Sequence, residues 1–197
     1  MPKPKWKLNT IYISERLQES LRPISRCALT TVVAPMGYGK TTAVNWYLEE
    51  RAKAGPLRVV RISVYSDNLA IFWRSAQDAF ARAGIDLLRE YALLTDQRVA
   101  AFLCMLAGRL PANVHLIIAS RDRFLPAAEI VRLGARVYRL GTEQLRLNHT
   151  ELAVYAHRCG TELSDAQAES LLYSSEGWFS AVYLNLRTLS EHGTLPE

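Results

Sequence analysis

The sequence has few cysteines and histidines, and none of them is spaced as a metal ligand. Its three cysteines, Cys27, Cys104 and Cys159, lie far apart and form no C-x-x-C pair. This pattern argues against a disulfide framework and against a zinc site, so we expect reduced and mostly buried thiols. The four histidines do not recur at ligand spacing beside carboxylates. The sequence therefore supports no metal other than one that a bound ligand brings with it.

Long apolar runs are also lacking. No stretch approaches the roughly 20 apolar residues that a membrane-spanning helix needs. The first residues, MPKPKWKLNT, carry charge but are not followed by the apolar segment of a signal peptide. We therefore expect a cytoplasmic protein with no membrane partner.

The composition is that of an ordinary globular protein. The chain has 197 residues, 49% of them hydrophobic and 22% charged, which is enough for one sizeable core with a small appended domain. The net charge of +5 permits contact with polyanions, but basic and acidic residues are interleaved along the chain. We predict no helix in this chain that is dedicated to reading DNA.

What the sequence does contain is a phosphate-binding loop. Residues 28–42 read ALTTVVAPMGYGKTT: a β-branched and apolar run, a turn with two glycines, and a helix-forming stretch. From Ala34 the spacing is A-x-x-x-x-G-K-T, the pattern of a P-loop with Ala in place of its first Gly. The strand-like and helix-like flanks favour a nucleotide site over a chance match to Gly-Lys-Thr.

Each part of this loop has a role in holding ATP or ADP. Gly37 and Gly39 let the backbone approach phosphates at the positive end of a helix. Lys40 supplies a positive charge for the β- and γ-phosphates, and Thr41 supplies a hydroxyl for the Mg²⁺ ion that neutralises them, with Thr42 near the α-phosphate. The predicted nucleotide contacts are Pro35, Met36, Gly37, Tyr38, Gly39, Lys40, Thr41 and Thr42.

Strand-like and helix-like segments alternate around the loop, as in a parallel α/β sheet with crossover helices. The predicted strands are 28–34, 58–64, 114–120 and 137–140. Predicted helices cover 15–22, the stretch after the loop as far as Ala54, 69–83, 96–110 and 127–133. Residues 11–16, just before the first helix, either pack on the core or cover the nucleotide base.

After residue 140 the pattern is helical throughout. Asn148 with Glu151, and Ser164 with Gln167, are capping-box pairs that predict helices over 149–158 and 165–175. Gly177 separates these from a third helix over 178–191. We therefore predict a P-loop α/β domain over residues 1–147 and a small all-helical subdomain over 148–197.

Five segments, taken in their order and spacing, resemble the STAND-class regulators of the MalT and large LuxR type, which are ATP-dependent transcriptional activators. The segments are APMGYGKTT, DNLAIFWRSAQDAF, LPANVHLIIASRD, LRLNHTEL and SEGWFSAVYL. The resemblance implies a nucleotide-binding domain and a helical domain that nucleotide exchange switches between resting and active states, with nucleotide-dependent self-association as a further expectation. It also implies that Arg121 senses the γ-phosphate; the alternative for Arg121 is a surface ion pair.

The sequence departs from this family in two ways. The family carries a strand that ends in paired acids, which position Mg²⁺ and the attacking water, and nothing here matches it. We therefore expect one strand fewer than in the family, with 58–64 and 114–120 either paired directly or 57–64 poorly held. The second departure is that the chain reaches Glu197 before any helical repeat or DNA-binding helix-turn-helix. DNA contact is thus expected only through a domain that is not in this chain.

Three functions remain open at this point. The leading hypothesis is a nucleotide-binding signalling module with weak or absent hydrolysis. The second is an active P-loop ATPase or kinase that uses Asp67 or Asp122 in place of the missing acids, with Arg121 as a further catalytic candidate. The third is a structural interaction module whose loop binds nothing.

Overall fold

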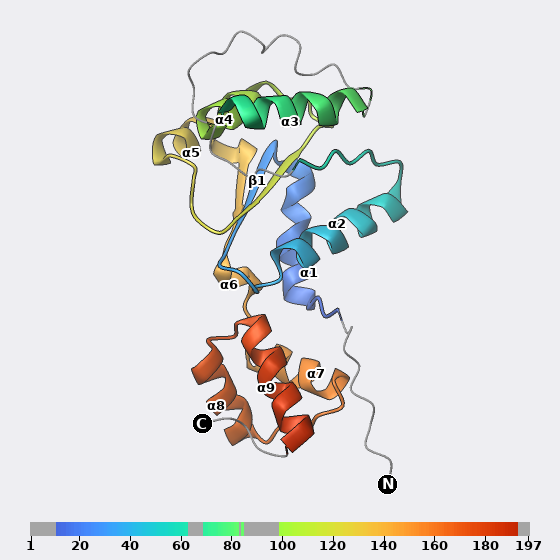
Figure 1. Ribbon diagram of the computed structural model, residues 1–197, viewed down its shortest axis with the longest axis vertical. Helices are drawn as coiled ribbons and strands as arrows, with labels where there is room; N and C mark the ends of the chain where they lie inside the picture. The colour runs from blue at the N-terminus through green and yellow to red at the C-terminus, as the bar shows by residue number, and fades with distance from the viewer. Residues whose placement is uncertain (1–10, 63–68, 83, 85–98, 193–197) are drawn as a thin grey trace.

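The computed structural model describes residues 11–62, 69–82, 84 and 99–192, and it divides into an α/β part and a helical part (Figure 1). The α/β part holds the sheet with helices on both of its faces, and the helical part lies beyond the carboxyl ends of the strands. In order, the elements are α1 (Glu15–Leu21), η1 (Arg22–Arg26), β1 (Leu29–Val33), α2 (Lys40–Ala54), α3 (Leu69–Arg82), α4 (Val99–Arg109), β2 (Leu116–Ser120), α5 (Ala127–Leu133), η3 (Gly134–Arg136), β3 (Val137–Leu140), α6 (Thr142–Leu145), α7 (His149–Arg158), α8 (Asp165–Ser175) and α9 (Phe179–His192).

In the described residues the sheet has three parallel strands in the order β2-β1-β3. Leu29 of β1 lies opposite Leu116 of β2 and Val137 of β3. β1 has a strand on each side and helices over both faces, which explains its unbroken run of apolar and β-branched residues. The predicted α/β arrangement with a parallel sheet is confirmed, as are the strands near 28–34, 114–120 and 137–140.

The strand predicted over 58–64 is wrong for its described residues, 58–62. These residues form no strand, and Leu57 and Val59 are 43% and 44% exposed. A strand needs a neighbour for its hydrogen bonds, and β2 and β3, the outer strands of the described sheet, pair only with β1. Of the two expected outcomes, direct pairing with the strand at 114–120 or a poorly held segment, residues 57–62 follow the second, because they do not pair with β2. Residues 63 and 64 lie outside the described residues.

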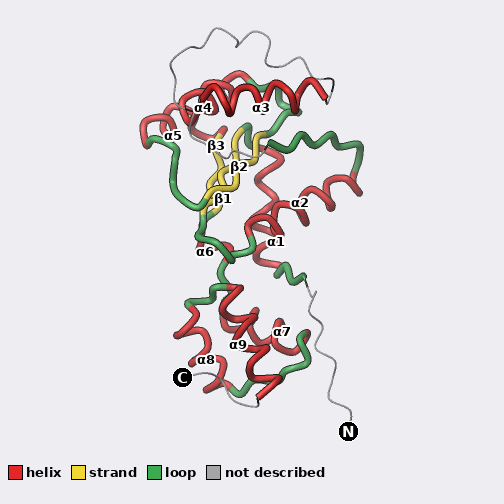
Figure 2. The backbone as a smooth tube through the Cα atoms, in the orientation of Figure 1, coloured by secondary structure: helices red, strands yellow, loops and turns green. Residues whose placement is uncertain are grey.

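Helices cover both faces of the sheet (Figure 2). On one face Val32 of β1 and Ala34, which directly follows β1, pack with Leu17 and Leu21 of α1 and with Tyr47 of α2. On the other face the strands pack against α4 and α5, in a cluster of buried residues formed by Leu29, Cys104, Ala107 and Leu133. A third cluster joins α3 to α4 through Phe72, Ala76, Phe102 and Leu106. All three cysteines are buried free thiols, as expected.

The helical part has its own core, formed by α7, α8 and α9 around Leu152, Tyr155, Leu171 and Leu186. Its first two helices begin at the predicted caps: the Asn148 side chain accepts from the Glu151 N–H, and the Ser164 side chain accepts from the Gln167 N–H. The short helix α6, which leads into this part, was not predicted.

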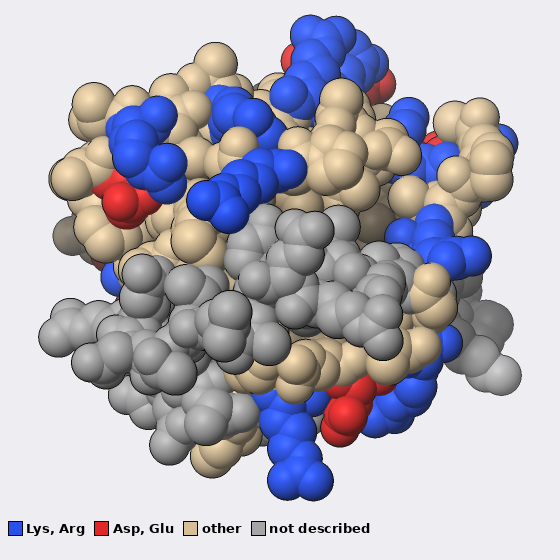
Figure 3. All heavy atoms as spheres, turned by 90° about the horizontal axis from the view of Figure 1, so that it is seen from above, with Lys and Arg blue, Asp and Glu red and all other residues tan. Residues whose placement is uncertain are grey.

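Two features of the described residues concern possible partners: where the charged side chains lie, and whether a helix could span a membrane. Seen from above the sheet, the described lysines and arginines stand in separate groups among uncharged residues (Figure 3). Within the described ranges, no helix is both long enough and apolar enough to cross a bilayer.

Candidate phosphate-binding site

The loop between β1 and α2 has the backbone shape that its glycines were expected to allow. Gly37 and Gly39 have φ values of +85° and +75°, a left-handed region that side chains with a Cβ disfavour. Gly39 is the N-cap of the 15-residue helix α2, and having no side chain it forms no side-chain cap with the first turn. The N–H groups that begin α2 are therefore left for a ligand, at the positive end of the helix dipole.

Two cations meet at this loop. Lys40 donates from Nζ to the carbonyl oxygens of Ala34 at 2.6 Å and Pro35 at 2.8 Å. Arg121, at the end of β2, places Nη2 3.9 Å from Sδ of Met36 in the loop. Burial and then the charge of Arg121 lower the pKa of Lys40. Because no carboxylate among the described residues pairs with either cation, the loop is a place where an anion would be stabilised.

A cleft of about 680 Å³ opens beside the loop, at the carboxyl ends of all three strands. Its size is in the range of small-molecule sites. The predicted residues Pro35, Arg121 and Asp122 line it, together with Ala34. Asp122 is exposed, and its backbone N–H donates to Ser120 Oγ at 3.3 Å. The other acidic candidate, Asp67, lies outside the described residues.

Two properties of the remaining loop residues matter for a ligand: their exposure to solvent and their ability to bind a metal ion. Thr41 and Thr42 are exposed in the first turn of α2, and Met36 is 67% exposed. Among the residues that the structure describes, no group of three or more His, Cys, Asp or Glu side chains could hold a metal ion. A single hydroxyl such as that of Thr41 suits Mg²⁺ only when phosphate oxygens and water complete the coordination. The residues therefore fit a phosphate chain with Mg²⁺, and they do not fit a metal bound by the protein alone.

The tip of the loop contacts the helical part, which sequence reasoning missed. Ser180 at the start of α9 donates to the Gly37 carbonyl from Oγ at 3.0 Å and from its backbone N–H at 3.3 Å. The Trp178 ring stacks on Tyr38, with ring centroids 6.3 Å apart and an interplanar angle of 20°. A Cβ on Gly37 would collide with the Trp178 indole and would come within 2.6 Å of Ser180 Oγ. One sequence signal was Gly177 followed by Trp178 at the start of the third predicted helix, but no period or spacing linked it to the loop.

A second, smaller cavity of about 50 Å³ lies between α1, the loop and the helical part. We call it the slot; its walls include Tyr12, Arg16, Tyr38, Thr42 and Phe179. The segment 11–16 is thus next to the loop, as one of its two expected roles requires. It also begins a packed helix, because Ser14 caps α1 by accepting from the Leu17 N–H at 3.2 Å.

Comparisons with known proteins give a distant similarity over most of the chain. No family model matches it. It is 26% identical over 215 residues to the HTH-type transcriptional regulator MalT of Yersinia enterocolitica, covering 90% of this chain and 24% of that protein. The MalT proteins of Yersinia pestis and Yersinia pseudotuberculosis are 23% identical over the same shares. The chain spans about a quarter of the length of the curated relatives it matches. This similarity agrees with the resemblance seen in the five sequence segments.

Proposed function

We propose that this chain is an ATP- or ADP-binding signalling module of a MalT-type transcriptional regulator, with weak or absent hydrolysis. The observation that carries the proposal is the loop at the start of α2: two left-handed glycines, a helix N-terminus without a side-chain cap, and two cations that no carboxylate of the described residues pairs with. These features are what a phosphate chain requires. The distant similarity to MalT supports the regulatory setting.

In this proposal the loop binds the phosphates and Arg121 reports on their number. Lys40 would exchange the carbonyls of Ala34 and Pro35 for phosphate oxygens, and the N–H groups of the first α2 turn would donate to the same chain. Mg²⁺, when bound with the nucleotide, neutralises phosphate charge beside Thr41. Arg121 directly follows β2, the neighbour of β1, and its guanidinium lies 3.9 Å from Met36 in the loop, so we assign the contact with the γ-phosphate to it.

Weak hydrolysis is proposed because the groups that would activate water are sparse. Asp122 is the described acid among the catalytic candidates, and it is an exposed residue beyond the end of β2. Catalysis of phosphoryl transfer depends on fixed positions, which an exposed side chain does not provide. DNA contact is assigned to other domains of such a regulator, since basic and acidic residues are interleaved along this chain.

The test is nucleotide-dependent stabilisation. A nucleotide that binds only the folded protein adds roughly 2.7 kcal/mol at a hundredfold excess over its Kd. Thermal unfolding with and without Mg-ATP or Mg-ADP should show this gain in the wild type and lose it in Lys40→Ala. Lys53→Ala is the matched control, because Lys53 is in the last turn of the same helix and pairs with Glu50 at 2.6 Å. An equal gain in wild type and Lys40→Ala would favour a structural module with an empty loop.

A further inference from the structure

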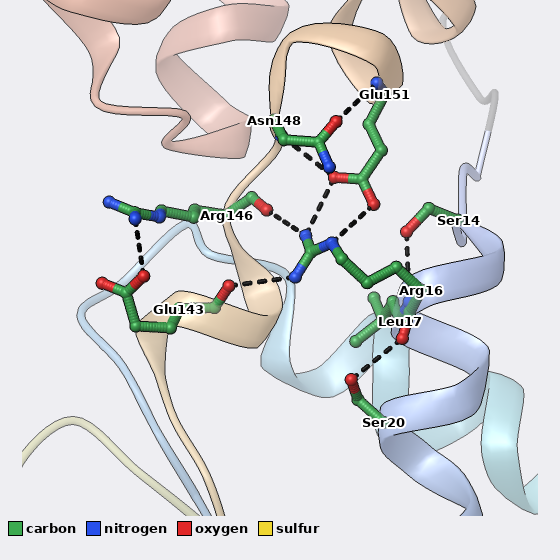
Figure 4. A network of polar contacts seen from close by, with 8 residues as sticks. All are labelled: Ser14, Arg16, Leu17, Ser20, Glu143, Arg146, Asn148 and Glu151. Carbon is green, nitrogen blue, oxygen red and sulfur yellow. Dashed lines mark hydrogen bonds and ion pairs between the residues drawn. The ribbon is translucent and has the colours of Figure 1, made fainter.

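Arg16 of α1 is held by four hydrogen bonds to the segment that joins the α/β part to the helical part (Figure 4). Two of them form a fork to the Glu151 carboxylate, from Nε to Oε1 at 2.9 Å and from Nη2 to Oε2 at 2.8 Å. The others run to the carbonyl oxygens of Glu143 at 3.0 Å and Arg146 at 2.6 Å. One side chain from the α/β part thus contacts both ends of the connection.

The carboxylate of Glu151, which Arg16 contacts, also forms part of the cap of α7 in the helical part. Glu151 is 6% exposed, and its Oε2 accepts from the Asn148 N–H at 2.9 Å, which completes the capping box of α7. Without Arg16 this buried carboxylate would keep its cap but lose its opposite charge, which is unfavourable in a poorly solvated place. The position of α7 is therefore tied energetically to the position of Arg16.

The carbonyl acceptors fix the connection itself. The Arg146 carbonyl belongs to the residue that ends α6, and Glu143 lies within that helix. The chain then passes through Leu147, whose N–H donates to the Gly177 carbonyl at 3.0 Å, and enters α7. Arg16 thus holds the residues about which the helical part would turn relative to the sheet.

The slot lies between this group and the loop. Arg16, Arg146 and Glu151 form part of its wall, and Tyr38, Gly39 and Thr42 of the loop region form another part. Beyond the slot, Ser180 and Trp178 of the helical part lie on the loop tip. At about 50 Å³ the slot has room for a few water molecules and is too small for a purine base.

We propose that Arg16 is a latch that keeps the helical part closed on the loop, and that its release, with rotation about residues 146–148, widens the slot and uncovers the loop tip. The nucleotide aspect of this inference rests on the proposed function. The latch itself does not, since it concerns contacts within the protein. Release of Arg16 would also free the Gly37 carbonyl from Ser180, so one event at the connection changes the phosphate loop.

Arginine is required for this role by its geometry. A planar guanidinium can serve a carboxylate with two parallel donors and still reach two carbonyl oxygens, whereas a lysine ammonium is a compact point charge. Arg16→Lys should therefore keep the charge and lose the fork. We expect it to behave as a partial release, between wild type and Arg16→Gln.

The first measurement is hydrogen exchange of the nucleotide-free protein. In Arg16→Gln, amide exchange of residues 36–42 and 177–181 should rise by about tenfold, while exchange in α3 and α4 stays unchanged. Arg187→Gln is the matched control, because it removes an exposed Arg187–Glu191 pair within α9 at 2.9 Å. Unchanged exchange of the loop in a folded Arg16→Gln protein would overturn the latch.

The second measurement is release of a fluorescent ADP analogue, which should be about tenfold faster in Arg16→Gln than in wild type or Arg187→Gln. If loop exchange rises but no variant binds the analogue, the latch stands and the proposed function fails. If the analogue binds and neither its release nor loop exchange changes, the latch fails and the proposed function stands.

A second variant, Glu151→Gln, tests the Arg16–Glu151 pair from its other side while keeping the cap of α7. Gln at this position keeps an oxygen for the capping box and removes the charge that Arg16 contacts. If the two residues act as one latch, the double variant Arg16→Gln/Glu151→Gln should show the same loop exchange as either single variant. Independent, additive increases would overturn the pairing, and far-ultraviolet circular dichroism establishes that each variant is folded.

Discussion

Strand β1 and residues 57–62 are both rich in β-branched and apolar residues, yet only β1 is part of the sheet. β1 has a hydrogen-bonded neighbour on each side, and its Leu29 and Val32 are fully buried. Residues 57–62 pair with no strand of the described residues, and Leu57 and Val59 are more than two-fifths exposed. The difference shows that β-propensity becomes a strand only where another strand is within reach.

The largest expected effect comes from comparing two glycines that have nearly the same backbone φ but different neighbouring atoms. Gly177 and Gly39 have nearly equal φ values, +72° and +75°. A Cβ at Gly177 would collide with the Leu147 carbonyl oxygen and come within 3.1 Å of its nitrogen, whereas a Cβ at Gly39 would meet nothing within 4 Å. We expect Gly177→Ala to lower the free energy of unfolding by about 3 kcal/mol or more, and Gly39→Ala by about 1 kcal/mol, the cost of a left-handed Ala.

Urea unfolding followed by circular dichroism measures both variants. The local probe is Trp178 fluorescence, read in a protein whose other tryptophans are replaced by Phe. Equal losses in the two variants would mean that backbone conformation alone decides the cost. The close contact between Gly177 and Leu147 would then have no energetic weight.

The second prediction compares the same residue in the two β-rich stretches. Val32→Ala removes buried methyl groups from the centre of the sheet and should lower the free energy of unfolding by about 2 to 3 kcal/mol. Val59→Ala, at a position that is 44% exposed, should change it by less than about 0.5 kcal/mol. Chemical denaturation gives both numbers. A large loss in Val59→Ala would show that residues 57–62 pair with a strand in solution.

These contrasts explain which features the sequence predicted. Helix starts at Ser14, Asn148 and Ser164 were correct because a cap is formed by residues three positions apart. The loop conformation was predicted because glycine makes it locally accessible. The failed strand depended on a distant neighbour, which local propensity cannot supply.

The contacts that join the two parts were missed for a similar reason. Arg16 and Glu151 are separated by 135 residues, and Gly37 and Ser180 by 143. No hydrophobic period or motif spacing connects such pairs. Only the fold brings them together, and the sequence had offered residues 11–16 no more than a choice between packing and covering a base.

The third prediction concerns the pH dependence of stability that comes from the Arg16–Glu151 pair. Burial acts to raise the pKa of Glu151, but hydrogen bonds from Arg16, Ser14 and the Asn148 N–H, with the charge of Arg16, lower it overall. A folded-state pKa below the unfolded value of about 4.3 means that the carboxylate stabilises the protein at neutral pH. This contribution disappears as the pH falls through the folded-state pKa.

Unfolding free energies between pH 7 and pH 3 test this prediction. The loss on acidification should be smaller in Arg16→Gln than in wild type, since the variant has already lost the pair. Glu191→Gln is the comparison for an exposed pair and should leave the pH dependence close to that of wild type. If Arg16→Gln and wild type lose stability in parallel, the Arg16–Glu151 pair is not what holds the pKa down.

The smallest expected effect concerns turnover of ATP. It follows from the contrast between the P-loop after β1 and residues 57–62, which form no strand. In the proposed function Gly37, Gly39, Lys40 and Thr41 hold phosphates, but the paired acids that the resemblance implies have no counterpart in the described sheet. Nucleotide should therefore bind with little or no phosphate release, and ADP should be held about as well as ATP. Asp122→Ala and Asp67→Ala should leave both binding and the low release rate unchanged. Steady-state phosphate release, measured beside equilibrium binding, checks this, and robust turnover that either substitution removes would favour an active ATPase over a nucleotide-sensing module.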